Sequence, residues 1–206
     1  RIKILAANGN SRTIEPLINE ALLGSAELGE IIVDMGEPHM SAFLRAVQTK
    51  LPAACQNCAD KMLDYASQHK PELVVATLAF PHSSTALTRA FNHIPSGSDA
   101  IRNPLQDAIK TKALGIMRKI QGAAPTAEDI AEFMRFVGEC QGELLTSDTM
   151  PIELNGTRTT MLHWAVVFTS QGKISLDNLK TILDLVGNTH LQDAQHLGQT
   201  LLHAAC

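Results

Sequence analysis

Two cysteines, Cys55 and Cys58, are the first residues whose types and spacing could support chemistry. Two thiolates can bind zinc, and His69 and His82 could supply the remaining ligands. A structural zinc site usually contains a second closely spaced pair, whereas these histidines are 13 residues apart. The spacing of the cysteines is also close to one helical turn, which would place both of them beside Met62 on the apolar face of a helix. We therefore predict no metal and no cofactor.

A thiol could instead act as a nucleophile with a histidine as its base. The candidate pairs are Cys140 with His163 and Cys206 with His203. Neither cysteine lies in a glycine-rich turn or in another sequence context typical of a nucleophile. We therefore predict that the chain is not an enzyme and has no catalytic residue. A thiol- or metal-dependent enzyme centred on residues 50–140 is the less favoured alternative.

Closely spaced carboxylates form the third group that could support acid–base or metal chemistry. One set is Glu128, Asp129 and Glu132, and the other is Asp60 and Asp64. Both sets lie in segments with helical periodicity, where such groups usually form the solvated face. The glycine-rich phosphate-binding motifs G-x-x-x-x-G-K and G-x-G-x-x-G are absent from the sequence. These patterns favour a solvated surface over a reaction centre.

The composition excludes several classes of protein. The chain has 206 residues, of which 45% are hydrophobic and 18% are charged, and its formal net charge is −4. It is too apolar to be disordered, has no apolar run long enough to span a membrane, and shows no basic stripe for nucleic acid. Its four cysteines are too few for a disulfide scaffold. We therefore predict a cytoplasmic protein that binds no nucleic acid, no membrane and no small-molecule substrate.

Hydrophobic periodicity predicts a mainly helical chain. The clearest helices are expected at 52–69, 126–141 and 175–186. Strand signals are sparse, and the best of them lie at 30–33 and 72–78. Turn residues separate these segments at 35–38, 94–97, 122–125, 155–156 and 187–188.

A six-residue pattern occurs twice near the C-terminus, as TMLHWA at 160–165 and as TLLHAA at 200–205. The threonine suits the N-cap of a helix, because its side chain can accept a hydrogen bond from an unpaired backbone N–H of the first turn. The histidine three residues later lies on the same face and can bond back to the threonine. The pairs that fit this arrangement are Thr160 with His163 and Thr200 with His203.

These two hexads, and the segment between them, resemble the ankyrin repeat, in which Thr-Pro-Leu-His-x-Ala opens the first of two antiparallel helices. Degraded copies of the hexad start at Ser41, Thr85 and Asn103, and residues 4–18 look like the end of a first helix followed by its second helix. The 18 residues between the copies at Thr85 and Asn103 cannot hold a full repeat. Either one of these two copies is a chance match, or one repeat has lost its outer helix.

The resemblance implies an all-α fold, an ankyrin-like helical-repeat solenoid with elongated and irregular repeats. It implies a single array over residues 1–206, which we expect to be part of a longer polypeptide because both ends fall inside a repeat. Irregular repeats of this kind are similar to those of bacterial effectors, which would place the protein in the cytoplasm of a host cell.

The function that the resemblance implies is a protein–protein interaction scaffold, which binds another protein through hairpin tips and the concave surface of its inner helices. The alternative is a targeting module of a multidomain effector enzyme. Carried over to the positions just before and just after the hexads, the predicted partner-binding residues are Met40, Gln48, Thr49, Ser84, Asn92, His93, Thr159, Val167, Phe168 and Gln199. We expect Val167 and Phe168 to be exposed and to anchor the partner.

Overall fold

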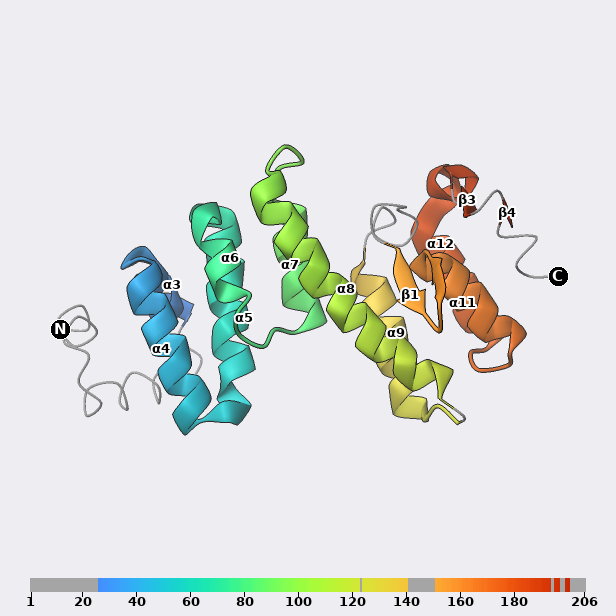
Figure 1. Ribbon diagram of the computed structural model, residues 1–206, viewed down its shortest axis with the longest axis horizontal. Helices are drawn as coiled ribbons and strands as arrows, with labels where there is room; N and C mark the ends of the chain where they lie inside the picture. Colours follow the sequence, from blue (N-terminus) through green and yellow to red (C-terminus); the bar gives the residue numbers. More distant parts are fainter. Residues whose placement is uncertain (1–25, 123, 141–150, 194, 197–198, 201–206) are drawn as a thin grey trace. The chain divides into compact units, whose positions relative to one another are not determined.

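The computed structural model describes residues 26–122, 124–140, 151–193, 195–196 and 199–200, and the side chains of residues 27–186 among them (Figure 1). The chain divides into two compact units, unit 1 (Arg1–Ala108) and unit 2 (Ile109–Cys206), and the boundary falls inside helix α8 (Asp99–Gln121). Both units are mainly helical, which confirms the predicted all-α class. None of the described helices is long and apolar enough to cross a membrane.

Unit 1 is a series of helices joined by short turns. In chain order they are α3 (Ala26–Asp34), α4 (Glu37–Lys50), α5 (Pro52–His69), the 3-10 helix η1 (Pro71–Leu73), α6 (Val74–Thr77), α7 (Ser84–His93) and the first part of α8. The central element is α5, which packs against α3, α4, α6 and α7. Its bounds are those predicted from the sequence. Pro52 suits the start of the helix, because the N–H that proline lacks would have no helical partner in the first turn.

The buried face of α5 forms much of the core of unit 1. Its buried residues recur at intervals of three and four along the helix, and they are Cys55, Cys58, Ala59, Met62, Leu63, Ala66 and Ser67. Both cysteines therefore lie beside Met62 on the apolar face of a helix, as the second explanation of their spacing predicts.

Unit 2 combines helices with two short antiparallel hairpins. After the rest of α8 it contains α9 (Ala127–Glu139), the hairpin of β1 (Ile152–Leu154) and β2 (Thr157–Thr159), α11 (Met161–Ser170), α12 (Leu176–Asp193), and the hairpin of β3 (Gln195–His196) and β4 (Gln199–Thr200). Helix α12 packs against both α9 and α11. The core of unit 2 therefore lies between these three helices.

Helix α9 begins with a reciprocal pair of hydrogen bonds. The Thr126 side chain accepts a bond from the backbone N–H of Asp129 (3.1 Å), and the Asp129 carboxylate accepts one from the backbone N–H of Thr126 (2.9 Å). This reciprocal arrangement is a capping box, formed by two residues three apart in the sequence. It starts a helix whose buried face contains Phe133, Phe136 and Val137.

Three local predictions are wrong. The best strand candidates, 30–33 and 72–78, are helical, in α3 and in η1 with α6 respectively. In α3 the β-branched run includes Ile32 and Val33, which are 1% and 0% exposed in a helix that packs against α5. Burial on a helical face therefore outweighs the weak strand preference of these side chains. The turn expected at 187–188 lies inside α12, which continues to Asp193.

The three degraded copies of the hexad do not begin helices. Ser41 lies inside α4, whose N-cap is Gly36. Thr85 lies inside α7, whose N-cap is Ser83, and Asn103 lies inside α8. None of these three copies therefore supplies the cap that the hexad pattern implies. A threonine-type cap works only where the first backbone N–H groups are unpaired, and inside a helix those groups already have partners.

Candidate partner-binding surface

The hexad at 160–165 lies at the start of α11. Thr160 is the N-cap, and its side-chain oxygen accepts a hydrogen bond from the backbone N–H of His163 over 3.3 Å. The same oxygen lies 2.8 Å from Nδ1 of the His163 ring. Both residues are buried, at 1% and 4% exposure. The pair therefore fixes the first turn of α11 from two sides, the backbone and the ring.

A hairpin precedes each of the two hexads. In the first, Thr159 at the end of β2 pairs with Ile152, and Thr160 follows directly. In the second, Gln199 and Thr200 in β4 pair with His196 and Gln195, so this hexad begins within the last strand of its hairpin. His203, like residues 4–18, lies outside the described residues.

The β1–β2 hairpin is held by its turn and by α11. Its turn residues Asn155 and Gly156 have φ angles of 52° and 77°, a backbone that favours asparagine and glycine in two-residue hairpins. At the other end of the hairpin, Nε1 of Trp164 donates a hydrogen bond to the carbonyl of Ile152 over 3.1 Å. The Trp164 ring stacks on Phe168 with centroids 5.8 Å apart. The hairpin is therefore anchored to the buried part of α11.

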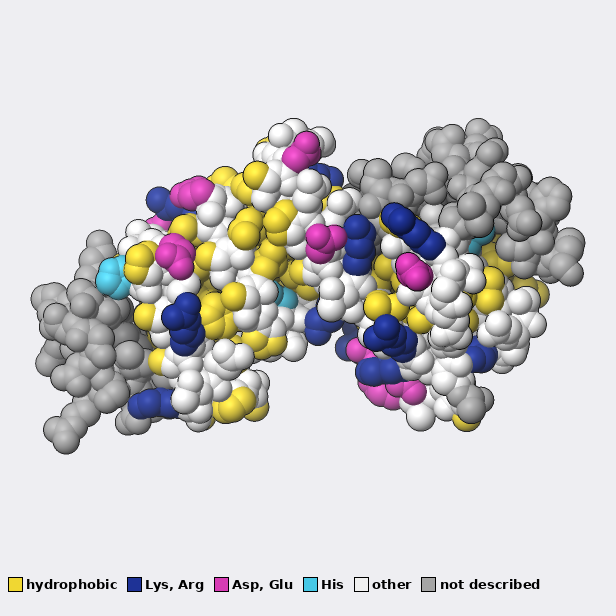
Figure 2. All heavy atoms as spheres, in the orientation of Figure 1, with side chains coloured by type: hydrophobic (Ala, Val, Ile, Leu, Met, Phe, Trp, Pro, Cys, Tyr) yellow, Lys and Arg dark blue, Asp and Glu magenta, His cyan; other side chains and the backbone are white. Residues whose placement is uncertain are grey.

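The outer part of this region is polar and open to solvent. The exposed hairpin residues are Glu153, Asn155, Gly156, Thr157 and Arg158, and Ser170 and Gln171 are exposed at the end of α11. The hairpin carries one acidic and one basic side chain, Glu153 and Arg158, both of them exposed (Figure 2). A rigid hairpin with an exposed polar tip is the kind of surface through which a partner can be recognised.

Three of the predicted partner-binding residues are buried. Met40, Thr159 and Phe168 are 0%, 4% and 0% exposed. Besides stacking on Trp164, Phe168 contacts the edge of Phe133 in α9, with ring centroids 6.1 Å apart. The expectation that Phe168 is an exposed anchor is therefore wrong, because its ring fills the space between α9 and α11.

The other predicted positions are at least partly accessible, or their side chains are not described. Four exposed residues lie at the C-terminal ends of α4 and α7, and they are Gln48, Thr49, Asn92 and His93. Ser84 and Val167 are half-buried. Gln199 lies in β4, where only the backbone is described. These residues therefore belong to three separate helices and one strand.

The three cysteines of the described part of the chain, Cys55, Cys58 and Cys140, are buried packing groups. Burial raises the pKa of the Cys55 thiol, and burial, followed by the neighbouring Cys55, raises that of Cys58. Burial also raises the pKa of Cys140 far above its ordinary value. A thiol with a raised pKa is protonated at neutral pH, and the protonated form is neither a good nucleophile nor a metal ligand. Within the described residues, no three His, Cys, Asp or Glu side chains are arranged to hold a metal ion.

A polar cluster joins α5 to the start of α7. Both carboxylate oxygens of Asp60 accept from the backbone N–H of Ser83 (3.0 and 3.3 Å), and one lies 3.1 Å from Nδ1 of His82. The Ser83 hydroxyl caps α7 by accepting from the N–H of Ala86. Nε2 of His82 lies 2.8 Å from the carbonyl of Thr77. The ring nitrogen that would activate a serine in a catalytic triad therefore contacts this carbonyl and not the Ser83 hydroxyl. The three residue types of a catalytic triad are present, but their order of contact is not that of a triad.

An open polar pocket lies beside this cluster. It is lined by Asn57, Asp60, Lys61 and Asp64 of α5 and by Ser83, Thr85, Ala86 and Arg89 of α7. Arg89 donates a hydrogen bond to Asp64 over 2.5 Å. Asp60 and Asp64, which the sequence suggested as a pair, therefore bind different groups.

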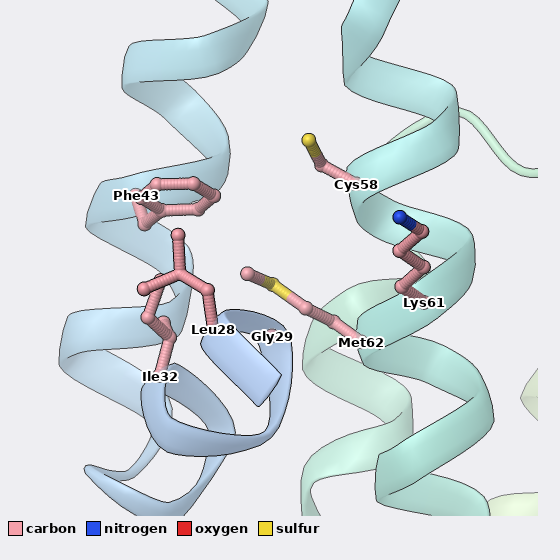
Figure 3. A pocket seen from close by; sticks show the side chains of 7 residues that line it. All are labelled: Leu28, Gly29, Ile32, Phe43, Cys58, Lys61 and Met62. Carbon is pink, nitrogen blue, oxygen red and sulfur yellow. The ribbon is translucent and has the colours of Figure 1, made fainter. Parts of the chain in front are cut away.

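The second pocket of unit 1 is a packing gap. It is lined by Leu28 and Ile32 of α3, Phe43 of α4, and Cys58 and Met62 of α5, together with Gly29 and Lys61. Figure 3 shows Phe43, Leu28 and Met62 pointing toward one another across it. Its volume of about 10 Å³ is at the lower limit for one water molecule. The gap is too small to bind a ligand.

Sequence reasoning missed two features. It placed a turn at Asn155–Gly156 and expected a partner to bind at hairpin tips, but it did not name the residues of this tip among the partner-binding residues. It weighed Asp60 and His82 separately, as part of a carboxylate pair and as a zinc ligand, although the structure joins them. The Asn-Gly dipeptide was a usable signal for the first feature. No local signal connects Asp60 with His82, because their contact depends on the packing of α7 against α5.

Comparison of the chain with models of protein families, with curated proteins and with solved structures found no match.

Proposed function

We propose that this chain is a protein-interaction scaffold of the ankyrin type, with no chemistry of its own. The observation that carries the proposal is the contact between Thr160 and His163 at the start of α11, directly after a hairpin. This is the contact that the hexad of the family is expected to make.

The order of elements in unit 2 supports the same proposal. The hairpin β1–β2 is followed by α11, by a turn at Gly172 with a φ angle of 69°, and by α12, which packs against α11. A second hairpin then follows, and the second hexad starts in its last strand. Hairpin, helix, turn, helix and hairpin is the order of elements in a stacked helical repeat, in which each helix pair needs a neighbour to complete its core.

The exposed surface indicates where a partner would bind. In this proposal the contact surface comprises the hairpin tip from Asn155 to Arg158 and the end of α11 at Ser170 and Gln171, all of which are exposed. The buried cysteines and the contacts of the polar cluster favour a binding role over catalysis. Specificity would then come from side chains on a rigid hairpin.

Site-specific photocrosslinking tests the proposal. A benzoylphenylalanine at Thr157 or Gln171 should crosslink one and the same protein in an extract of the source cells, and Arg158→Glu should reduce that product. The matched control carries the crosslinker at Lys180, an exposed position on α12. Equal products from Thr157 and Lys180, or no product from Thr157 and Gln171, would contradict the proposed surface.

A further inference from the structure

The open polar pocket of unit 1 is large enough to hold a small molecule. Its volume is about 280 Å³, whereas the packing gap of Figure 3 measures about 10 Å³. A single water molecule needs roughly 10–15 Å³ on this measure, and sites for drug-sized ligands occupy about 300–1,000 Å³. The pocket therefore has room for a compact ligand that is smaller than most drugs.

The walls of the pocket carry equal numbers of acidic and basic groups. Asp60 and Asp64 lie one turn apart on α5, Lys61 follows Asp60, and Arg89 lines the pocket from α7. A ligand with a single charge would therefore meet two groups of its own sign. A zwitterion adds no net charge and can place each of its charges beside groups of the opposite sign, so the composition of the walls favours a zwitterion.

Lys61 is the group that is available for a negative charge. Its side chain is half-buried, and within the described residues it makes no hydrogen bond and no ion pair. An ammonium group carries three N–H donors, so Lys61 can bind a carboxylate without giving up a partner. Arg89 donates to Asp64 through Nη1, and the guanidinium has further N–H donors for the same carboxylate.

Asp60 and Asp64 are the groups that are available for a positive charge. Their side chains are 20% and 27% exposed, so both can be reached from the pocket. In the described part of the chain, Oδ1 of Asp64 is buried and has no hydrogen-bond partner, which is unfavourable for a carboxylate oxygen. Asp64 therefore has fewer donors than its two oxygens can accept, and a ligand ammonium group would add one.

We propose that this pocket binds a free α-amino acid, with its ammonium group at Asp60 and Asp64 and its carboxylate at Lys61 and Arg89. At neutral pH an α-amino acid carries both charges on substituents of one carbon atom. Its side chain would extend toward solvent, because the pocket is open. The site belongs to unit 1, and it is independent of the contact surface proposed for unit 2.

Titration of the ¹⁵N-labelled full chain with L-alanine tests the proposal. The backbone amide signals of Ser83, Ala86 and Arg89 should shift and reach saturation, with a dissociation constant of about 1 mM. Propionate is alanine without its ammonium group, and ethylamine is alanine without its carboxylate. Each of these compounds should bind at least about tenfold more weakly than L-alanine, since each leaves one set of charged groups without a partner.

Two variants separate the pocket from general electrostatic effects. Lys61→Gln should weaken L-alanine binding about tenfold, because the carboxylate loses its unpaired cation. Arg45→Gln makes the same change of net charge at an exposed position of α4 outside the pocket, and it should leave the affinity unchanged.

Four results would overturn the proposal. They are the absence of saturation up to about 50 mM L-alanine, propionate or ethylamine binding as tightly as L-alanine, an unchanged affinity in Lys61→Gln, and equal losses in Lys61→Gln and Arg45→Gln. If Lys61→Gln does not fold, the comparison of the three compounds on the unaltered chain decides.

Discussion

Side-chain caps start three helices of unit 2, whereas two of the longer helices of unit 1 start without one. In unit 2, side chains of Thr126, Thr160 and Ser175 accept hydrogen bonds from backbone N–H groups in the first turns of α9, α11 and α12. In unit 1, Ser83 caps α7 in the same way, but α4 and α5 have a proline in the first turn after Gly36 and Leu51, and neither of these two residues makes a side-chain cap. A cap is visible in a few consecutive residues, whereas a helix without one depends more on what its apolar face packs against.

The position of the helix start explains why the hexad works at Thr160 and not at Ser41. The hexad at Thr160 coincides with a helix start, and there its hydroxyl has an unpaired N–H to bind. The copy at Ser41 lies one turn inside α4, where its hydroxyl donates to Glu37. The same sequence pattern therefore caps a helix at Thr160 and lies inside a helix at Ser41, and the experiments below test that distinction.

The largest effect is expected from Phe168→Ala in unit 2. The ring is fully buried and contacts both Trp164 and Phe133, so its removal should lower the free energy of unfolding by about 3–5 kcal/mol. Urea unfolding followed by fluorescence measures this directly, because Trp164 is the single tryptophan and lies in unit 2.

The half-buried neighbour Val167 provides the control for this experiment. Val167→Ala should cost clearly less than Phe168→Ala, because less apolar area leaves water when the native side chain packs. A Phe168→Ala variant as stable as the unaltered chain would mean that the ring does not form the core of unit 2. The assigned packing of α11 against α9 in unit 2 would then be wrong.

How far the sequence predicts the fold depends on where each signal comes from. The starts of α5, α9 and α12 were predicted to within a residue or two, because Pro52, Thr126 and Ser175 act on their own first turns. The strands expected at 30–33 and 72–78 are helices, because packing against neighbouring helices decides their conformation. Helix starts set by a residue in the first turn could be predicted from the sequence, and conformations set by packing between helices could not.

The same division holds for the candidate sites. Thr160 and His163 could be paired from sequence because a helical turn brings them together. Asp60 and His82 are 22 residues apart and meet only when α7 packs against α5. The burial of Phe168 likewise depends on α9, whose position a linear pattern does not contain. Contacts within one turn were therefore predictable, and contacts between helices were not.

A smaller effect should separate the true hexad from its copy. Thr160→Ala removes an N-cap and a partner of the His163 ring, and should cost about 1–2 kcal/mol. Ser41→Ala, in the interior of α4, should change stability by less than about 0.5 kcal/mol, because alanine favours a helix interior more than serine does. Urea unfolding of both variants, with circular dichroism as the signal, makes the comparison. Equal losses would show that the helix-start interpretation of the hexad is wrong.

A similar loss, of about 1 kcal/mol, is expected from Gly156→Ala. This residue has a φ angle of 77°, which side chains other than glycine adopt only with strain. Gly36→Ala, at φ 94° before α4, should cost a similar amount in unit 1. Gly97→Ala is the control, because Gly97 does not have a left-handed φ angle and a Cβ there, as at Gly156, would meet nothing within 4 Å. Thermal unfolding that ranked Gly97→Ala with the other two variants would contradict the assigned turn conformations.

The smallest effect is a stabilisation at the start of α9 that should be lost in acid. Hydrogen bonds from the Thr126 side chain and then from its backbone hold the pKa of Asp129 below its ordinary value. A carboxylate whose folded pKa lies below its unfolded value of about 3.9 stabilises the fold above that value, and this contribution is lost as the pH falls through the folded pKa. The stability advantage of the unaltered chain over Asp129→Asn, measured as the urea midpoint, should therefore shrink as the pH is lowered from about 6 to about 3.

Glu128→Gln is the control for this experiment. Glu128 is exposed and its ion pair with Arg135, at 3.8 Å, is a weak surface contact, so this variant should show little change with pH. The same difference at both pH values would show that the charge of Asp129 does not contribute to the cap, and would leave the starts of helices in unit 2 to hydroxyl groups alone.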